Sequence, residues 1–380
     1  MIESVEIFSG AGGLALGLQK AGFNHVALYE RDAASCKNMN FNIRNGYPPM
    51  KNWTVIQSDV RSVNYKVFEE KIQLLAGGPP CQPFSLGGKH KSCNDTRDMF
   101  PEAVRAVRET KPKAFIFENV QGLLRKSFQT YLNYIFLQLQ YPEIVRKDLS
   151  WQEHLAELEK YHATGRADGL FYRILFRSVN AADYGVPQIR RRIIIVGFRN
   201  DFHANWFFPL PTHSQEALEY SKWISKSYWL EHNIFPPKEI PLTSTDIRRL
   251  RMKIEGNIFP LKPWRTVRDT LKDISRAKKI LNNENYSGAK IYKGHSGSSL
   301  DLPSKAIKAG VHGVPGGENM LVEDNGSVRY YTVRESAAIQ TFPHEYVFVA
   351  SRSENMRQIG NAVPVELARI IGASLYEKFI

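Results

Sequence analysis

The 380-residue sequence has few cysteines, and its three, Cys36, Cys81 and Cys93, include no CxxC pair. Three are too few for a disulfide framework, and no zinc-binding spacing occurs, so we expect no metal. No apolar run approaches the ~20 residues that a membrane span needs. The strand-like start at Val5 leaves no room for a signal peptide. These features predict a cytoplasmic protein with reduced cysteines, outside any membrane.

Acidic residues are the minority: 38 Asp and Glu stand against 51 Lys and Arg, for a formal net charge of +13. Residues 240–310 hold 15 basic and 6 acidic side chains, which is a net +9 from this segment alone. A basic chain can simply be a soluble one, but an excess concentrated in one segment favours a polyanionic partner. The charge distribution therefore predicts nucleic acid as the partner.

The first third of the chain predicts successive β–α units of a parallel sheet. Strand-like residues 4–8 precede a turn from Gly10 to Gly13 and an apolar-periodic helix from Leu14 to about Ala21. Glu30 ends the second strand-like run, and Asp59, followed by Val60, ends the third. A glycine turn lets a ligand reach a helix N-terminus, and acids at neighbouring strand ends hold ribose and adenine groups. The pattern predicts an adenosine pocket, although such acids also serve as helix caps.

One cysteine stands in a stiff loop after the next strand-like run. Residues 72–76 form a largely apolar run, and Gly77-Gly78-Pro79-Pro80-Cys81-Gln82-Pro83-Phe84-Ser85 follows it. The glycines and prolines end the strand and set a non-helical loop, which exposes the thiol and aims it. A structural cysteine belongs instead in apolar surroundings. We therefore interpret Cys81 as a nucleophile, with an ordinary turn as the alternative.

Polar side chains also follow the next predicted strand. Residues 113–117 form a largely apolar run that leads into Glu118-Asn119-Val120, so Glu118 is expected at the same sheet edge as Cys81. Two further strand-like runs, 171–179 and 192–197, are expected to pair antiparallel, with Gln188-x-Arg190-x-Arg192 between them. Arginine runs are more often solvated, but this one abuts a buried strand. At least one guanidinium is therefore expected to point into a site.

The composition changes after about residue 200, where prolines and aromatic residues are interleaved and the basic segment follows. Its candidate phosphate contacts are Arg248, Arg249, Arg251 and Lys253. Gly360-Asn361-Ala362-Val363-Pro364 then leads into a final helix from Val365 to about Lys378. We predict a large catalytic and cofactor-binding domain formed by residues 1–199 and 331–380. Residues 200–330 would form a small DNA-binding domain, and residues 127–168 an inserted helical region.

These motifs resemble those of the DNA (cytosine-5) methyltransferases of the bacterial restriction–modification type. Five motifs carry the resemblance and occur in the family's order: Phe8-Ser9-Gly10-Ala11-Gly12-Gly13, Pro79-Pro80-Cys81-Gln82, Glu118-Asn119-Val120, Gln188-x-Arg190-x-Arg192 and Gly360-Asn361-Ala362-Val363-Pro364. The resemblance covers nearly the whole chain, apart from residues 127–168 and the basic segment. It implies an α/β, Rossmann-like S-adenosylmethionine-dependent methyltransferase fold with a smaller, irregular target-recognition domain.

The resemblance also implies the reaction: sequence-specific methyl transfer from S-adenosylmethionine to carbon 5 of a flipped-out cytosine in double-stranded DNA. Cys81 would add to carbon 6 of the base, Glu118 would share a proton with ring nitrogen 3, and Arg190 and Arg192 would supply cationic donors. The implied cofactor contacts are Phe8, Gly10, Gly12, Gly13, Glu30, Asp59, Val60, Pro80, Phe100 and Asn361. Phe100 departs from the leucine often found at its position. Gln82 and Ser85 join the basic residues as predicted DNA contacts.

We expect a monomer, because an asymmetric cleft suits a single site, and any cognate restriction endonuclease would act independently. Three alternatives remain open. The first is a cytosine-5 methyltransferase acting on transfer RNA, a class with a shorter recognition segment. The second is an NAD-dependent oxidoreductase, because residues 10–15 fit G-x-G-x-x-A. The third is a catalytically silent DNA-binding protein.

Overall fold

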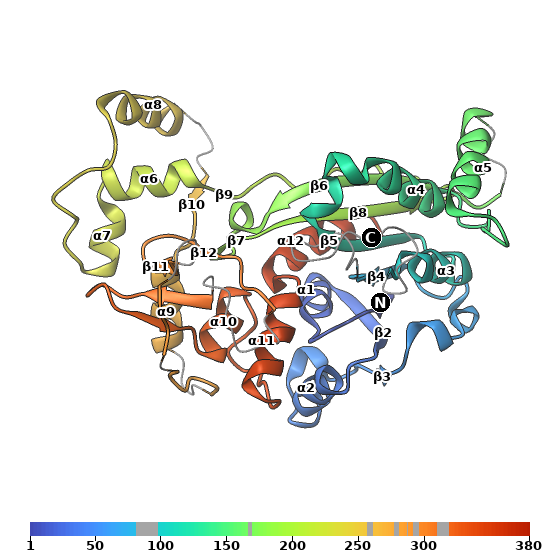
Figure 1. The fold of residues 1–380 in the computed structure, drawn as a ribbon, viewed down its shortest axis with the longest axis horizontal. Coiled ribbons are helices and arrows are strands. Elements are labelled where there is room, and N and C mark those ends of the chain that lie inside the picture. Colours follow the sequence, from blue (N-terminus) through green and yellow to red (C-terminus); the bar gives the residue numbers. More distant parts are fainter. Residues whose placement is uncertain are drawn as a thin grey trace. The chain divides into compact units, whose positions relative to one another are not determined.

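The computed structural model describes residues 1–80, 98–165, 169–256, 261–276, 281–286, 288–291, 296–309 and 319–380. The chain forms two compact units (Figure 1). Unit 1 comprises residues 1–179, 191–208 and 371–380, and unit 2 comprises residues 180–190 and 209–370. Residues 331–370 thus pack with unit 2, whereas the functional division at residues 199 and 331 stays a prediction.

Unit 1 is built on a seven-stranded sheet with the strand order β3-β2-β1-β4-β5-β8-β6. Its strands are β1 (Ile2–Ile7), β2 (Phe23–Glu30), β3 (Val55–Gln57), β4 (Leu74–Gly77), β5 (Ala114–Val120), β6 (Tyr172–Asn180) and β8 (Arg191–Arg199). The first five run parallel, and β8 pairs antiparallel with β5. The strand order reverses between β1 and β4, and ligands bind open α/β sheets at such a point, outside the carboxyl ends of the strands.

Helices cover both faces of this sheet. They are α1 (Gly13–Ala21), α2 (Ala33–Arg44), α3 (Phe100–Thr110), α4 (Gln129–Gln140), α5 (Trp151–Ala163) and the end of α12 (Val365–Tyr376). Val5 and Ile7 of β1 belong to a core that includes α3 and α4, so these helices cover one face. On the other face His25 bonds to α1. The predicted α/β fold is therefore confirmed, and its alternating β1 side chains separate the two layers.

Residues 127–168, predicted to be an inserted helical region, are part of unit 1 and contain α4 and α5. Six side chains of α4 lie in the main core: Tyr131, Leu132, Tyr134, Ile135, Leu137 and Leu139. A buried stripe with helical spacing packs on the sheet as any core helix does, so α4 contributes to the core of unit 1.

Buried polar groups lie between β1, β2 and α1. The His25 ring is fully buried, with Nδ1 3.0 Å from the Ser4 hydroxyl and Nε2 2.9 Å from the Ala15 carbonyl oxygen. Burial lowers the pKa of His25 to about 4, which keeps the ring neutral at neutral pH. Neighbouring Glu6 is also buried, and burial raises the pKa of its carboxyl group. A neutral imidazole therefore links the sheet to the first helix.

The wild-type protein is expected to lose stability, relative to a His25→Gln variant, as the pH falls from about 6.5 to 4. In this window the unfolded chain binds a proton at His25 that the folded chain excludes, so the folding free energy contributed by the neutral ring is complete above pH 6.5 and is lost below it. The difference in free energy of unfolding between the wild-type protein and the variant should change by about 3 kcal/mol over this pH range. Urea unfolding at pH 4.5 and pH 7 measures it, and parallel curves would contradict it.

Unit 2 has short strands and several helices. The strands are β7 (Gln188–Ile189), β9 (His213–Ser214), β10 (Lys262–Pro263), β11 (Ser298–Ser299), β12 (Ser304–Lys305), β13 (Met320–Val322) and β14 (Val328–Tyr330). The helices are α6 (Gln215–Trp223), α7 (Ser227–His232), α8 (Ser244–Glu255), α9 (Val267–Ser275), α10 (Val333–Ile339), α11 (Arg352–Asn361) and the start of α12. Tyr228 and Trp229 form a small aromatic cluster with Trp223 and Trp264, and other buried side chains of this unit include Ile339, Tyr346 and Ile359.

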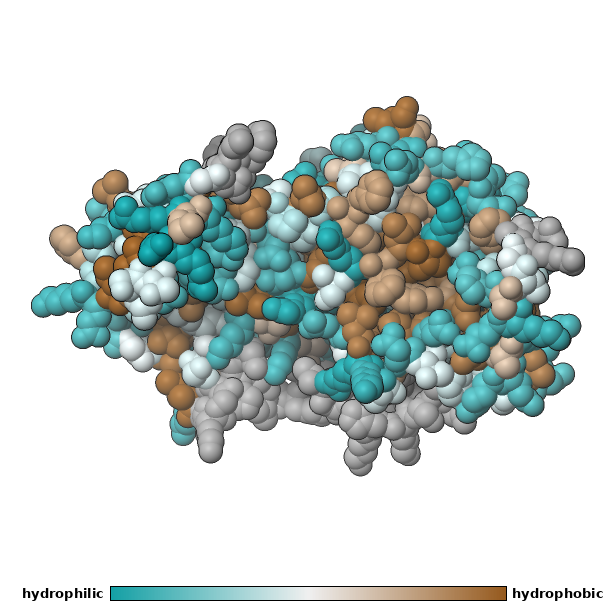
Figure 2. Space-filling view, turned by 90° about the horizontal axis from the view of Figure 1, so that it is seen from above, coloured by the Kyte–Doolittle hydropathy of each residue, from teal (hydrophilic) through white to brown (hydrophobic). Residues whose placement is uncertain are grey.

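Hydrophilic side chains dominate the surface near α8, whereas apolar ones gather over β6 and α4 in unit 1 (Figure 2). Phe176 of β6 is 46% exposed there and packs on Phe136 of α4. No helix in the described ranges is long and apolar enough to cross a membrane.

Candidate active site

The glycine-rich turn between β1 and α1 has a left-handed backbone. Gly10 and Gly12 have φ values of 55° and 76°, and a Cβ on Gly12 would lie 3.1 Å from the Trp53 ring, so glycine is required there for conformation and space. Within the described chain no side chain caps α1, which begins at Gly13. Its first N–H groups can therefore receive an anion such as a ligand carboxylate.

The Glu30 carboxylate lies beside this turn. Its Oε2 accepts a hydrogen bond from the Gly10 N–H at 2.7 Å, and its Oε1 accepts one from the Asp32 N–H at 2.8 Å. These two bonds orient the carboxylate and use only part of its acceptor capacity, which is about four lone pairs. The remaining lone pairs suit two vicinal hydroxyl groups, as the predicted ribose role requires.

The Asp59 carboxylate is bound by an arginine side chain, which its sequence position did not indicate. Arg61 donates from Nε to Oδ1 at 2.9 Å and from Nη2 to Oδ2 at 2.6 Å. These side-chain hydrogen bonds hold the pKa of Asp59 below its usual range, so the group is a fixed anion. A ligand amino group would have to share this carboxylate with Arg61. Sequence analysis missed Arg61, although an arginine two residues after an aspartate is the available signal.

Adjacent Val60 is buried, and its carbonyl oxygen accepts from Arg105 Nη2 at 2.6 Å. Phe8 has a φ of 58°, which is uncommon for a non-glycine residue. Phe100 begins α3 and is fully buried in the unit 1 core, whereas Pro80 is exposed. The structure thus brings most of the predicted cofactor residues to the carboxyl edge of one sheet.

The strand end that precedes the predicted nucleophile is held in place on both sides. The Asn119 side-chain amide donates to the Pro79 carbonyl oxygen at 2.9 Å, and the Met99 N–H donates to the Pro80 carbonyl oxygen at 3.4 Å. Cys81, Gln82 and Ser85 lie outside the described residues. Their sequence position nevertheless continues directly from a proline pair that β5 positions.

Glu118 and Arg192, both predicted to be catalytic, lie side by side as an ion pair. Glu118 Oε1 lies 2.7 Å from Arg192 Nε, and both side chains are largely buried. Arg192 is the β8 partner of Val120, so it is the diagonal neighbour of Glu118 on one face of the antiparallel pair. The other carboxylate oxygen lies 3.7 Å from where a Gly78 Cβ would stand. A carboxyl group with a cationic neighbour therefore lies beside the strand end before Cys81.

Arg190, in contrast, binds backbone within unit 2. It is almost completely buried, and it donates to the carbonyl oxygens of Ile307, Gly360 and Ala362 at 3.1, 2.7 and 3.1 Å. Arg190 lies between two strands, because β7 ends at Ile189 and β8 begins at Arg191. It therefore does not share the β8 face on which Arg192 lies. The described contacts of Arg190 hold the turn that contains Asn361.

Two glutamines complete this network. Gln340 donates to the Ile359 carbonyl oxygen at 2.7 Å and accepts from Gln188 Nε2 at 3.1 Å, while Gln188 Oε1 accepts from the Ile307 N–H at 2.9 Å. A Cβ on Gly360 would lie 2.3 Å from the Ala309 backbone nitrogen, so the turn is packed without spare room. Asn361 itself is exposed. Sequence analysis missed Gln340, whose only signal is a polar residue after an apolar helix.

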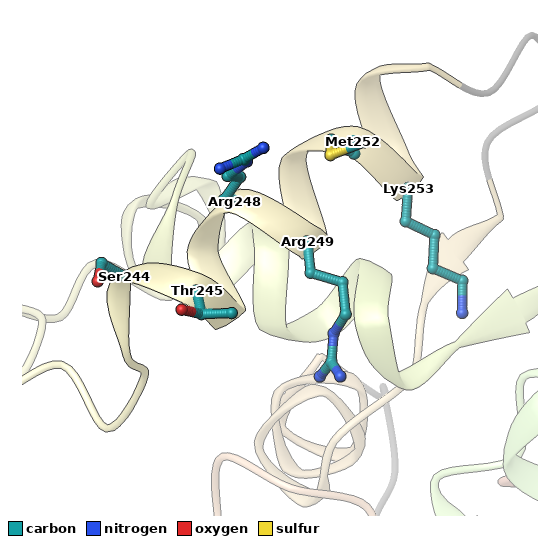
Figure 3. Close-up of a pocket in the computed structure, with 6 residues that line it drawn as sticks. All are labelled: Ser244, Thr245, Arg248, Arg249, Met252 and Lys253. Atoms are coloured by element: carbon teal, nitrogen blue, oxygen red, sulfur yellow. The ribbon is translucent and has the colours of Figure 1, made fainter.

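The basic residues predicted to contact DNA lie on α8 (Figure 3). Arg248, Arg249, Arg251 and Lys253 are all exposed, while Leu250 is buried on the opposite side. Open surface grooves along the helix are lined by these cations together with Ser244 and Met252. The helix therefore presents positive charge to the solvent.

The family model described as C-5 cytosine-specific DNA methylase matches residues 2–141 and 147–377. The match includes most of the region 127–168 and the basic segment, so the predicted gaps in the resemblance were wrong. The Type II methyltransferase M.NgoMIV of Neisseria gonorrhoeae is 32% identical over 376 residues, which cover 98% of this chain and 96% of the relative. Type II methyltransferase M.Eco47II of Escherichia coli is 32% identical over 380 residues, covering 98% and 78%.

Solved structures share the fold. The Dnmt2 methyltransferase of S. pombe aligns with a TM-score of 0.55 at 17% identity, covering 99% of both chains. The Entamoeba histolytica methyltransferase EhMeth aligns with a TM-score of 0.56 at 15% identity, covering 100% of this chain and 99% of its own. Both agree with the sheet-based architecture of unit 1.

Proposed function

Because this chain belongs to the C-5 cytosine-specific DNA methylase family and is a methyltransferase of Type II restriction–modification systems, we propose that it methylates a flipped-out cytosine through a covalent bond from Cys81 to carbon 6. The substrate is DNA, and flipping is needed because carbon 5 is inaccessible to an enzyme within a stacked duplex. The observation that carries the proposal is the Glu118–Arg192 pair beside the strand end before Cys81.

In the proposed chemistry, the Cys81 thiolate adds to carbon 6 and converts the ring to an enamine with a nucleophilic carbon 5. A free thiol titrates near about 8.5, so the site has to favour the thiolate at the moment of attack. Glu118 shares a proton with ring nitrogen 3 and so neutralises the charge that the attack creates. Arg192 supplies a cationic donor at the base and orients Glu118. Once carbon 5 carries the transferred methyl group, loss of its proton allows Cys81 to leave.

The residues of unit 1 fit the methyl donor that this family implies, S-adenosylmethionine, which would supply an electrophilic methyl group. The uncapped N-terminus of α1 suits a carboxylate, and Glu30 retains acceptors for ribose hydroxyls. We propose that Asp59 and Val60 hold the adenine and that Phe8, Gly10, Gly12, Gly13, Pro80, Phe100 and Asn361 complete the contacts. No metal has a role in this proposal.

We further propose that residues 1–199 and 331–380 serve catalysis and cofactor binding and that residues 200–330 choose the DNA sequence. Gln82 and Ser85 would contact DNA beside Cys81. A monomer acts on each site, and a cognate endonuclease, where present, acts independently.

Arg190 is expected to serve as a positioning residue for the turn that contains Asn361. Arg190→Gln removes donors from the Ile307, Gly360 and Ala362 carbonyl oxygens, so KM for S-adenosylmethionine should rise by about ten- to a hundredfold while kcat changes less. Steady-state kinetics at saturating DNA checks this. Arg191→Gln, a substitution of the exposed neighbouring arginine, is the matched control. A fall in kcat alone would instead place Arg190 in the chemical step.

The whole function is tested by methylation of plasmid DNA, followed by bisulfite sequencing. One cytosine within one sequence context should be protected from conversion. Transfer RNA offered with labelled methyl donor is the parallel arm, because the tRNA enzymes share this chemistry. Methylated tRNA with unmodified plasmid would overturn the proposal in favour of that class.

A further inference from the structure

The structure separates the four cations of α8 into two pairs. Lys253 forms an ion pair with Glu216 of α6, and Arg249 Nη2 lies 3.5 Å from Asp246 Oδ1. Figure 3 shows Arg249 and Lys253 directed to one side of the helix and Arg248 with Met252 on the other. Each member of the first pair therefore has a carboxylate that offsets its charge.

Arg248 and Arg251 have no ion pair with any carboxylate among the described residues. They are three residues apart, so they share a face of the helix, and Met252, which is 71% exposed, lies beside them. The groove on this face is lined by Ser244, Arg248, Arg251 and Met252 and, at the end of the helix, by Glu255. Two guanidinium groups that form no ion pair with a described residue and an exposed apolar side chain thus form one surface, and the Tyr220 hydroxyl holds the nearby Glu255 carboxylate.

The helix that carries them is fixed at both ends. Thr243 and Asp246 form a capping box at its start, and the Tyr220 hydroxyl donates to Glu255 at its end, at 2.8 Å. These bonds also hold the two acidic groups of α8 within the helix ends. Leu250 is 2% exposed and anchors the helix on unit 2. The arginines therefore start from a rigid backbone, which lowers the entropy lost when they bind a partner.

We propose that Arg248 and Arg251 bind phosphates of the DNA duplex, that Arg249 and Lys253 do not, and that α8 thereby adds affinity without choosing the sequence. This inference rests on the proposed function. Phosphate binding does not require Arg248 and Arg251 to give up an ion pair with any residue that the structure describes, whereas Arg249 and Lys253 would have to leave Asp246 and Glu216. Guanidinium groups bind phosphate through two parallel hydrogen bonds, and phosphate contacts position a protein on DNA without reading its bases.

The test compares two double variants with the same change in charge, Arg248→Gln/Arg251→Gln and Arg249→Gln/Lys253→Gln. Dissociation constants are measured on a fluorescent duplex at several salt concentrations, with one duplex containing the methylated site and one of unrelated sequence. The first variant should lose about tenfold in affinity for each lost phosphate contact near 0.1 M salt, on both duplexes. The slope of its log binding constant against log salt concentration should become shallower by about two. The dissociation constant of the second variant should stay within about threefold of the wild-type value, because salt screens exposed charges that make no contact with the DNA.

Equal losses in the two variants would reduce the effect to net charge and overturn the inference. A loss confined to the duplex with the methylated site would mean that these arginines read bases, and a loss seen with single-stranded RNA but not with duplex would mean another polyanion is bound. The methylation rate at saturating DNA tests the proposed function separately from the affinity for DNA: kcat should persist in the Arg248→Gln/Arg251→Gln variant. Absence of any methylation by the wild-type protein would instead refute the proposed function itself.

Discussion

Cys81→Ala is expected to lower the methylation rate by at least about a thousandfold, because no other group in the proposed mechanism makes carbon 5 nucleophilic. DNA that contains 5-fluorocytosine should trap the wild-type enzyme covalently, since fluorine cannot leave carbon 5 as a proton does. The variant should bind this DNA without forming a covalent adduct. Denaturing gel electrophoresis distinguishes the two.

Cys36→Ala is the matched control for the trapping experiment. Cys36 is buried in α2, and burial raises its thiol pKa to about 12, so it remains protonated and unreactive at neutral pH. The Cys36 variant should still be trapped. Trapping of the Cys81 variant to the same extent as wild type would remove Cys81 from the mechanism.

Glu118→Gln is expected to lower the single-turnover rate by about 10²- to 10⁴-fold, the range typical for loss of a positioned general acid. Glutamine keeps the shape of the side chain beside Arg192 but provides no acidic proton for ring nitrogen 3. Binding of S-adenosylmethionine should change little, because Glu30 and the glycine turn are elsewhere on the sheet edge. Rapid-quench measurement with enzyme in excess of DNA isolates the chemical step.

Asp201→Asn provides a control for loss of an arginine–carboxylate pair in general. Asp201 lies 2.7 Å from Nε of Arg199, at the end of the same strand, β8, that carries Arg192. This variant should keep the wild-type rate. If Asp201→Asn and Glu118→Gln slowed the reaction alike, the effect would come from disturbance of β8 and not from lost proton transfer.

The sequence predicted much of unit 1 because its signals are local. The strand-like run before the glycine turn and the apolar-periodic helix after it mark β1 and α1 to within a few residues of their observed bounds, and Glu30 marks the end of β2. Acids and amides at the ends of parallel strands necessarily meet at one sheet edge. The placement of Glu30, Asp59 and Glu118 at this sheet edge was therefore predictable from their sequence positions alone.

The missed features all depend on contacts between distant segments. Helical periodicity showed that residues 127–168 contain helices, but not that α4 packs into the main core. Nothing local indicates that Gln340 bonds to Gln188, 152 residues away. Likewise, the sequence does not distinguish the four basic residues of α8 from one another. The structure does, because Glu216 of another helix pairs with Lys253.

By itself the sequence determined the kind of chemistry, since five ordered motifs and a lone cysteine between prolines identify the residue types and their order along the chain. The tertiary structure alone decided which arginine of the 190–192 run meets Glu118. That choice follows from the antiparallel register that pairs Val120 with Arg192. Register is set by backbone hydrogen bonding and burial across two strands, and a shift of one residue would turn Arg192 to the other face of the sheet.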